Sequence, residues 1–552
     1  MIACPGRFTP RRARTPFDLL LLLLVAVAAC RGRPDHRGGA APDESPRYGG
    51  TLVIAGSSDL EAANTLVTGE VYTQEVLRHL LFMPLIRNDS AFGYEPWLAR
   101  SWEMLGDTGV VFHLRDDVVW HDGTPTTAWD VAFTFERAKH PETAFANVES
   151  FFGRWTGVEV VDSFTVRFSF EPHIDPLAGL PLFPIMPRHL LGDVPPARLR
   201  NAEFNWRPVG NGPFRFVSYQ SGDRWVFEAN PDFPEELGGR PYVDRVVWRV
   251  IPEGTAQVAE ILSGGVDLIL GPPSADIQRL DARPDLRALV QPSRKFQFIV
   301  FNGKRSPLDD PRVRRALVMA IDRGEILEVL RAGYGMLAAG PVPPFHWAYD
   351  PELEPLPFDT AAAKALLAEA GFLDRDGDGF LEGSDGRVLE FSLTIPVGNS
   401  YNRNVAEMIQ ADLADIGVRM RLRPTDAAAM FADLTAPERR FDAAFLAWES
   451  DLRLSLHHLF HSSAMQGPFQ MASYGNPELD RLLDGIVAAT ERDQALPLWR
   501  KVQEILREEQ PWGVFFHTPD LYVVNERVRN VRMDMRGAFH SLPRWWLAEA
   551  GD

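Results

Sequence analysis

Hydrophobic residues recur with two different periods along most of the chain. Between residues 166 and 170 apolar and polar residues alternate, as they do in a half-buried strand. Elsewhere apolar residues recur every three or four positions, which is typical of one face of a helix. The segment that begins at Thr127 is an example, and Thr127 and Asp130 are spaced to form a capping box at its start. The two periods together predict a mixed α/β protein.

The second half of the chain contains a pattern typical of a β-α-β unit. It predicts a strand at residues 391–395, a helix that carries apolar residues from 405 to 416 and ends at Gly417, and an alternating strand at residues 418–422. Such units build open α/β sheets. A chain of 552 residues is too long for one ordinary core, so two or three domains are expected.

The first thirty residues have the pattern of an export signal. A positive region of Arg11, Arg12 and Arg14 precedes an uninterrupted apolar run from Leu19 to Ala29. As a helix this run would rise about 16 Å, roughly half the hydrocarbon core of a bilayer. The sequence Val27-Ala28-Ala29-Cys30 that ends it is similar to the bacterial lipobox, whose cysteine is acylated. We expect a signal peptide at residues 1–30 and a lipid anchor at Cys30; the alternative is a plain cleaved signal in which Cys30 is incidental.

Composition limits the partners, cysteine chemistry and membrane segments that can be expected after residue 30. Residues 31–47 are rich in Arg, Gly, Pro and Asp without periodicity, which predicts a flexible tether. The formal net charge of −18 argues against a nucleic-acid partner. The cysteines are Cys4 and Cys30, so no disulfide or cysteine-based site is expected beyond residue 30. No later apolar run is long enough to span a membrane.

Four segments carry a resemblance to a known family. They are Pro96 to Arg137, which includes FHLRDDVVWHDGTP, then GNGPFRF at Gly210 to Phe216, Asn302 to Arg323, and YGNPELDRLLDGI at Tyr474 to Ile486. QPWGVFFH at Gln510 to His517 matches more loosely. In this order they resemble the extracellular solute-binding protein family 5, a group of oligopeptide-, dipeptide- and nickel-binding proteins. The matches are spread over about Tyr48 to Val531.

The resemblance implies a two-lobed fold like that of type II periplasmic binding proteins. Two mixed α/β lobes are joined by crossing strands, which by similarity run through Phe296 to Asn302 and His517 to Val524. The domains expected after the signal peptide and tether are lobe I (48–295, with an extra subdomain at about 86–184), lobe II (296–516) and a return to lobe I (517–552).

The implied function is that of the substrate-binding subunit of an ABC importer, which is not an enzyme. It would capture a small solute, with short peptides as the leading choice, between lobes that close by a hinge. The expected partners are the permease and ATPase complex, the ligand, and the membrane through the lipid anchor. The chain is expected to be an extracytoplasmic monomer that requires no cofactor. A nickel-chelate or oligosaccharide binder, a ligand sensor and, least favoured, an exported hydrolase remain alternatives.

The resemblance also implies candidate ligand-binding residues. In peptide-binding members a Trp-x-x-Asp loop faces the cleft, and its aspartate pairs with the α-ammonium of the ligand; Trp448 and Asp451 match it. The alternative is an acidic surface loop with a core tryptophan. Glu449 is an extra acid that would favour a more cationic ligand or face solvent. Asn302 would bracket the ligand from the first crossing strand, with a backbone-capping role as the alternative.

An acidic stretch resembles the start of a calcium-binding loop. Asp374, Asp376 and Asp378 hold positions one, three and five of an EF-hand-like pattern, with Gly379 at position six. Asp385 holds position twelve in place of the usual glutamate. These four aspartates are candidate ligands of a structural calcium ion; the alternative is an aspartate-rich turn.

Two histidines have the spacing of a transition-metal site. His457 and His461 are four residues apart on a predicted helix, so their imidazoles can face the same way. No acid stands beside them as in zinc proteases, and a solvated helix face is the alternative.

Overall fold

The computed structural model describes residues 45–450 and 454–548. Cys30, the predicted signal peptide, most of the predicted tether and Asp451 therefore lie outside the described residues. Among the described residues no helix combines the length and apolar character needed to cross a membrane.

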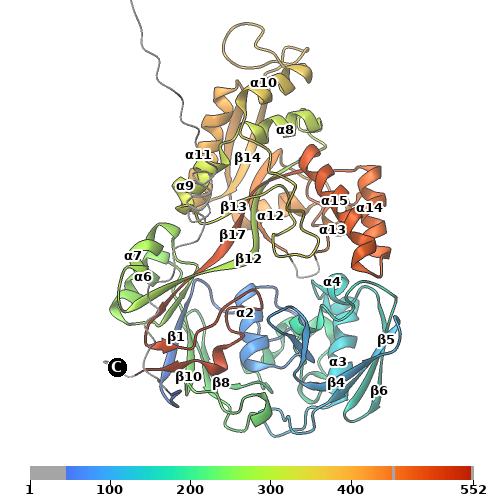
Figure 1. Cartoon of the computed structure of the whole chain (residues 1–552), viewed down its shortest axis with the longest axis vertical. Coiled ribbons are helices and arrows are strands. Elements are labelled where there is room, and N and C mark those ends of the chain that lie inside the picture. Colours follow the sequence, from blue (N-terminus) through green and yellow to red (C-terminus); the bar gives the residue numbers. More distant parts are fainter. Residues whose placement is uncertain (1–44, 451–453, 549–552) are drawn as a thin grey trace, which may run out of the picture. The chain divides into compact units, whose positions relative to one another are not determined.

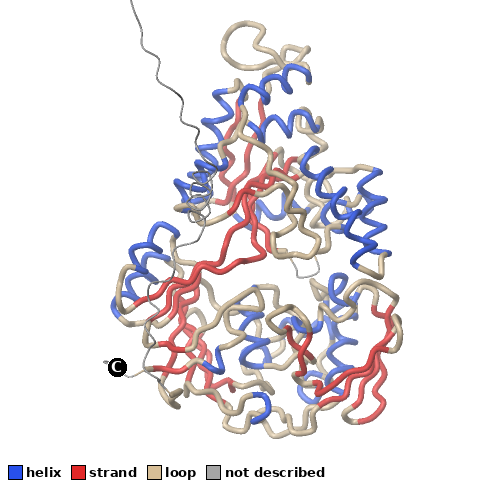
Figure 2. Tube along the Cα trace, viewed as in Figure 1, coloured by secondary structure: helices blue, strands red, loops and turns tan. Residues whose placement is uncertain are grey.

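One sheet of eleven strands organises the described part of the chain (Figures 1 and 2). In spatial order the sheet contains β15 (Arg419–Thr425), β14 (Glu390–Pro396), β16 (Ala443–Glu449), β12 (Leu286–Phe301), β17 (Trp512–Asn525), β11 (Leu268–Leu270), β1 (Thr51–Gly56), β10 (Arg245–Val250), β9 (Arg224–Ala229) and β8 (Phe214–Gln220). The short β13 (Met336–Leu337) pairs with β17. The sheet contains both parallel pairs, such as β1 with β10, and antiparallel pairs, such as β10 with β9, which confirms the predicted mixed α/β architecture.

The strands β12 and β17 are the longest in this sheet and belong to both of its halves. They pair with each other in antiparallel fashion, and the ladder is interrupted between Gln291 and Lys295. On one side of the interruption β12 also pairs with β16, from Lys295 to Phe301. On the other side β17 pairs with β11. The domain boundary expected after residue 295 thus falls inside β12.

The lobe that contains β1 and β8 to β11, which we call lobe I, has a large core cluster and a smaller one that includes Val258, Ile261 and Leu280. Its largest buried side chains include Trp120, Trp155, Trp225 and Trp545. A second sheet lies in the region of the expected extra subdomain and consists of β4 (Ala99–Met104), β5 (Gly109–Leu114), β7 (Thr165–Phe170) and β6 (Trp155–Asp162). Its core residues belong to the same cluster as those of the main sheet. The remaining short strands of lobe I are β2 (Ile86–Asn88), β3 (Tyr94–Pro96), β18 (Val528–Arg529) and β19 (Trp546–Leu547).

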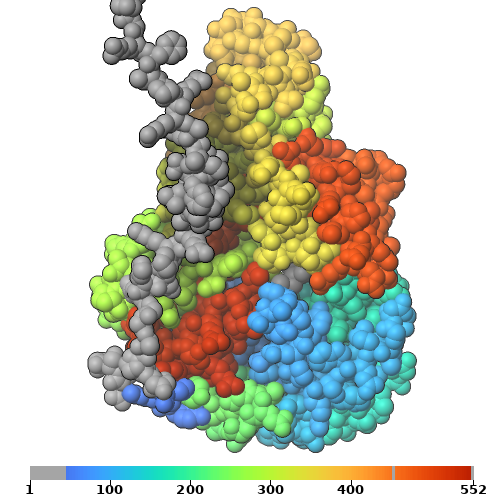
Figure 3. Space-filling view, viewed as in Figure 1, coloured from blue at the N-terminus to red at the C-terminus, as the bar shows by residue number. Residues whose placement is uncertain are grey.

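Two of the helices of lobe I, the first and the second, begin at a side-chain cap. The helices of this lobe are α2 (Val71–Val76), α3 (Ala128–Lys139), α4 (Val148–Phe152), α5 (Arg188–Leu191), α6 (Gly254–Ser263) and α7 (Ile277–Asp281). The capping box predicted for α3 is present, because the backbone N–H of Thr127 donates to Asp130 Oδ2 at 2.9 Å. The C-terminal segment packs on this lobe, and Figure 3 shows it (red) against segments coloured blue and green.

The other lobe, lobe II, surrounds β14, β15 and β16 and has two core clusters. The first packs against helices α8 (Pro311–Met319), α9 (Arg323–Arg331), α10 (Thr360–Glu369) and α11 (Ser400–Asp415). The second involves α12 (Ala427–Thr435), α13 (His457–Phe460), α14 (Pro477–Ala488) and α15 (Arg492–Glu509). The predicted strand–helix–strand unit is confirmed as β14, α11 and β15, with the two strands parallel.

Candidate functional site

A pocket opens where β12 and β17 pass between the lobes. The pocket has a cavity volume of about 30 Å³ and is partly open to solvent. Lobe I contributes α2 and the segment after β17, lobe II contributes the end of β16, and the two long strands contribute the rest. The residues that line it are Val71, Tyr72, Glu75, Pro292, Ser293, Arg294, Lys295, Glu449, Asp520, Tyr522, Asp534, Met535, Gly537 and Ala538.

Each carboxylate that lines the pocket has a cationic partner. Arg294 Nη2 lies 2.6 Å from Glu449 Oε1 and Lys295 Nζ lies 2.7 Å from Asp520 Oδ1. Asp534 pairs with Arg536 at 2.7 Å, and the buried Glu75 pairs with Arg78. A ligand ammonium would have to compete with one of these cations for a described carboxylate.

Burial changes the proton affinity of several pocket groups. Burial raises the pKa of Glu75, although the guanidinium of Arg78 opposes the change. Burial alone would lower the pKa of Lys295, but Asp520, Tyr72 and Glu449 together outweigh it and raise that pKa above its usual value. Burial also raises the pKa of Tyr72 and of Tyr522, so both phenols stay protonated and able to donate hydrogen bonds.

Trp448 and Glu449 of the predicted Trp-x-x-Asp loop lie at the end of β16 but face different surroundings. Adjacent strand residues point to opposite faces. Glu449 lines the pocket, whereas the half-buried ring of Trp448 lies 5.8 Å from the rings of both Phe469 and Trp512. Trp448 thus packs on the second core cluster of lobe II, and it is not one of the residues that line this pocket.

Asn302 is buried just beyond β12, with 1% of its surface exposed. Its Nδ2 donates to the carbonyl oxygens of Arg439 and Phe441 at 2.9 and 2.8 Å, and its Oδ1 accepts from the backbone N–H of Lys304. These bonds use both amide hydrogens, as expected for an asparagine that caps backbone groups. Asn302 does not line the pocket.

Of the residues predicted from sequence to bind ligand that the structure describes, only Glu449 lines the pocket. Tyr72, Glu75 and Asp534 come from segments that share no local pattern with β16, and only the fold brings them together. Asp520 follows the Gln510 to His517 motif by three positions, so that motif was the nearest available signal.

The acidic loop assembles four carboxylates, but they are not the four that were expected. One carboxylate oxygen from each of Asp374, Asp376, Asp378 and Glu382 lies within 4.8 Å of the others. Asp385, the expected fourth ligand, is not in the group. Its Oδ1 accepts the backbone N–H of Arg387 at 3.1 Å, and its Oδ2 lies 3.6 Å from the guanidinium of the same residue.

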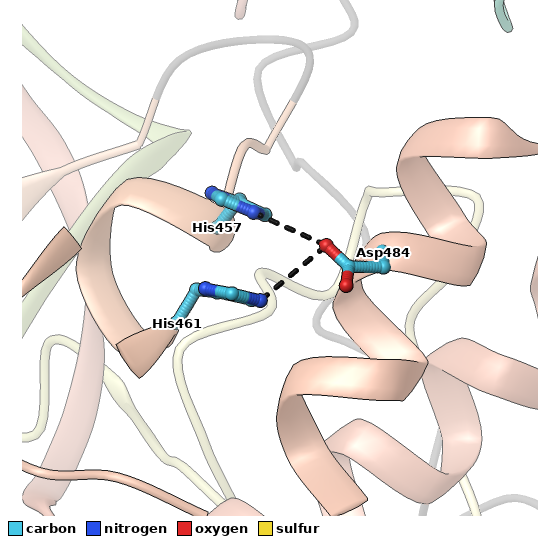
Figure 4. A group of neighbouring side chains, drawn as sticks. All are labelled: His457, His461 and Asp484. Carbon is cyan, nitrogen blue, oxygen red and sulfur yellow. Dashed lines mark ion pairs between the residues drawn. The ribbon is translucent and has the colours of Figure 1, made fainter. Parts of the chain in front are cut away.

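A carboxylate does lie beside the paired histidines, although sequence spacing did not reveal it (Figure 4). The stacked rings of His457 and His461 direct their Nε2 atoms at Asp484 Oδ1 on α14, at 3.4 and 3.3 Å. Nδ1 of His461 accepts the backbone N–H of Ser463 at 3.0 Å, so Nε2 of the neutral ring carries the hydrogen. A metal-bound histidine normally donates from its second nitrogen. The group thus places two imidazoles within ion-pair distance of one carboxylate on α14.

A protein-family model matches the part of the chain that contains most of these features. The model for "Bacterial extracellular solute-binding proteins, family 5 Middle" matches residues 93–462, more than half of the chain. The chain belongs to this family. Family 5 comprises extracellular binding proteins, and its matched region extends from the small sheet of lobe I through β12 to the histidines on α13.

Relatives match this family 5 protein along most of their length. The oligopeptide-binding protein AppA of Bacillus subtilis is 27% identical over 546 residues, which cover 96% of this chain and 98% of AppA. Heme-binding protein A of Haemophilus influenzae is 30% identical over 462 residues, 79% of this chain and 81% of its own. The structure of AppA from Bacillus subtilis in complex with a nonapeptide aligns with a TM-score of 0.80, covering 92% of this chain and all of AppA. The two-lobed periplasmic-binding-protein fold is thereby confirmed.

Proposed function

We propose that this chain is the peptide-binding subunit of an ABC importer. The observation that carries the proposal is the match to the oligopeptide-binding protein AppA, which covers 96% of the chain in sequence and has a TM-score of 0.80 in its nonapeptide complex. The permease and ATPase of such an importer are the proposed partners. The chain is proposed to bind and release its solute unchanged.

The pocket supports capture between the lobes. A ligand in it touches α2 from lobe I and the end of β16 from lobe II. Such a ligand favours the arrangement in which both sets of contacts are made at once, because only differential contacts can shift a conformational equilibrium. The hydrogen-bonding phenols of Tyr72 and Tyr522 suit the polar backbone of a peptide.

Asp451 is the proposed partner of the peptide's α-ammonium. Every described carboxylate of the pocket already has a cation, and Asp451 follows the pocket residue Glu449 by two positions in the sequence. A charged hydrogen bond contributes about 1.5–3 kcal/mol. Loss of this pair is therefore expected to weaken peptide binding about ten- to hundredfold.

The decisive experiment is a calorimetric and thermal-shift screen of protein that lacks residues 1–30. We expect peptides of two to nine residues to bind and raise the melting temperature, and an N-acetylated peptide to bind more weakly. Asp451→Asn should remove this preference for a free amine, whereas Glu449→Gln, which replaces a carboxylate already paired with Arg294, should retain it. A response to nickel–histidine, hemin or a saccharide, with none to any peptide, would refute peptide binding. Cleavage of a bound peptide would refute a purely binding role.

Membrane attachment through Cys30 is a separate part of the proposal. It rests on the lipobox-like sequence Val27 to Cys30, and two or more acyl chains hold a protein stably to a bilayer. In cells that process lipoproteins, Cys30→Ser should move the protein from the membrane fraction to the soluble fraction. A wild-type protein found in the soluble fraction would contradict the anchor.

A further inference from the structure

The loop after α10 gathers negative charge without neutralising it. Asp374, Asp376, Asp378 and Glu382 each place a carboxylate oxygen within 4.8 Å of the others. Within the described part of the chain none of the four forms an ion pair. Arg375 is the only cationic residue between positions 374 and 382, and its Nη2 is directed to the carbonyl of Gly371 at 3.3 Å. Carboxylates this close repel one another unless a cation lies among them.

Glu382 supplies an independent sign that a cation belongs there. It is 5% exposed, while the three aspartates are exposed. Its Oε2 accepts the backbone N–H of Arg375 at 2.8 Å, and its Oε1 is buried without a hydrogen-bond partner. A buried carboxylate oxygen that lacks a partner is costly, because it has given up its water. A metal ion at the centre of the group would provide the missing partner.

Backbone hydrogen bonds hold the loop and its first aspartate in place. Asp374 accepts the N–H of Gly377 through Oδ1 and the N–H of Gly379 through Oδ2, at 2.7 and 3.2 Å. Gly377 and Gly379 have φ values of 81° and 91°, which side chains disfavour. The loop is also fixed to lobe II, because the N–H of Leu381 donates to the carbonyl of Gly417 and Leu381 packs against the first core cluster.

We propose that Asp374, Asp376, Asp378 and Glu382 bind one calcium ion, with Glu382 in the role that the sequence pattern assigned to Asp385. Calcium takes six to eight oxygen ligands at about 2.3–2.6 Å, so one ion can reach oxygens as much as about 5 Å apart. Zinc prefers nitrogen and sulfur ligands, and magnesium keeps much of its water and a strict octahedron. In Figure 1 the loop lies beside α10, far from the crossing of β12 and β17, so the ion would stabilise lobe II and not contact the solute.

The test is a titration of calcium chloride into the full chain, purified in detergent and treated with EDTA. We expect one saturable site, a higher melting temperature with calcium, and much weaker binding of magnesium chloride. Glu382→Gln keeps the size of the side chain and should raise the Kd for calcium at least about tenfold. Asp376→Asn changes an exposed ligand and should do the same. The matched control Asp385→Asn should leave the Kd within about twofold.

Four results would overturn the assignment. They are the absence of saturable calcium binding, equal affinity for magnesium, an effect of Asp385→Asn as large as that of Glu382→Gln, and wild-type affinity in both Glu382→Gln and Asp376→Asn. Peptide binding is measured separately, so neither proposal depends on the other.

Discussion

His517 shows how burial of one residue ties stability to pH. It lies in β17, opposite Phe296 of β12 and Met336 of β13, and is 6% exposed. Burial lowers its pKa to about 4, whereas an unfolded chain has an ordinary histidine pKa of about 6.5. Between these values the unfolded state binds more protons than the folded state. The free energy of unfolding therefore falls as the pH falls through this window.

From this group alone we expect a loss of about 2 kcal/mol in unfolding free energy between pH 7 and pH 5. In urea denaturation of His517→Gln, the decrease over the same pH range should be smaller by about that amount, whatever the variant's stability at pH 7. The exposed His140→Gln is the control and should keep the wild-type slope. An unchanged slope in His517→Gln would show that this histidine is not the buried titrating group.

At the scale of single elements, Asp130 holds two helix starts together. Its Oδ2 accepts the N–H of Thr127 at the start of α3, and its Oδ1 accepts the N–H of Arg188 at the start of α5 at 2.8 Å. Asp130 is 4% exposed, and its removal leaves two part-buried backbone donors without this acceptor.

We expect Asp130→Ala to lower the free energy of unfolding by about 2–4 kcal/mol. Asp130→Asn retains one acceptor oxygen and should lose less. Glu136→Ala, an exposed change in the same helix, should stay within about 0.5 kcal/mol of wild type. Urea titration measures all three, and equal stability of Asp130→Ala and Glu136→Ala would contradict a shared cap.

The elements that sequence predicted well are those with local signals. The capping box of α3 and the unit of β14, α11 and β15 depend on spacings within about twenty residues, where periodicity and end signals act. Contacts between residues that are far apart in the sequence leave no such local pattern. Asp484 reaches His457 only because α13 packs on α14, and Glu382 displaced Asp385 because the loop closes on itself as a bridge between Leu373 and Glu382 instead of entering a helix.

At the scale of the whole molecule, lobe I is completed by the end of the chain. Tyr522, Val524, Phe539 and Trp545 share one core with residues such as Leu52. The strand β11 pairs on one side with β17, through Leu268 opposite Val524. Residues 48–295 therefore contain most of lobe I but lack part of its core and one strand of its sheet.

A fragment of residues 48–295 is expected not to fold cooperatively. Fusion of residues 512–548 to its end through a flexible linker should restore a cooperative thermal transition, because it returns the missing strand and the four core side chains. Circular dichroism during heating measures both fragments. A sharp transition in the shorter fragment would show that the C-terminal return is dispensable.

The interruption between Gln291 and Lys295 has a mechanical consequence for β12 and β17. A hydrogen-bonded ladder resists twisting, and it resists least where bonds are missing and where Pro292 offers no N–H. Pro292, Ser293, Arg294 and Lys295 also line the pocket. A hinge at this interruption would use the same few residues that line the pocket, so we expect a bound ligand to stiffen it. When residues 292–295 are substituted, we therefore expect the dissociation rate of the ligand and the rate of lobe opening to change together.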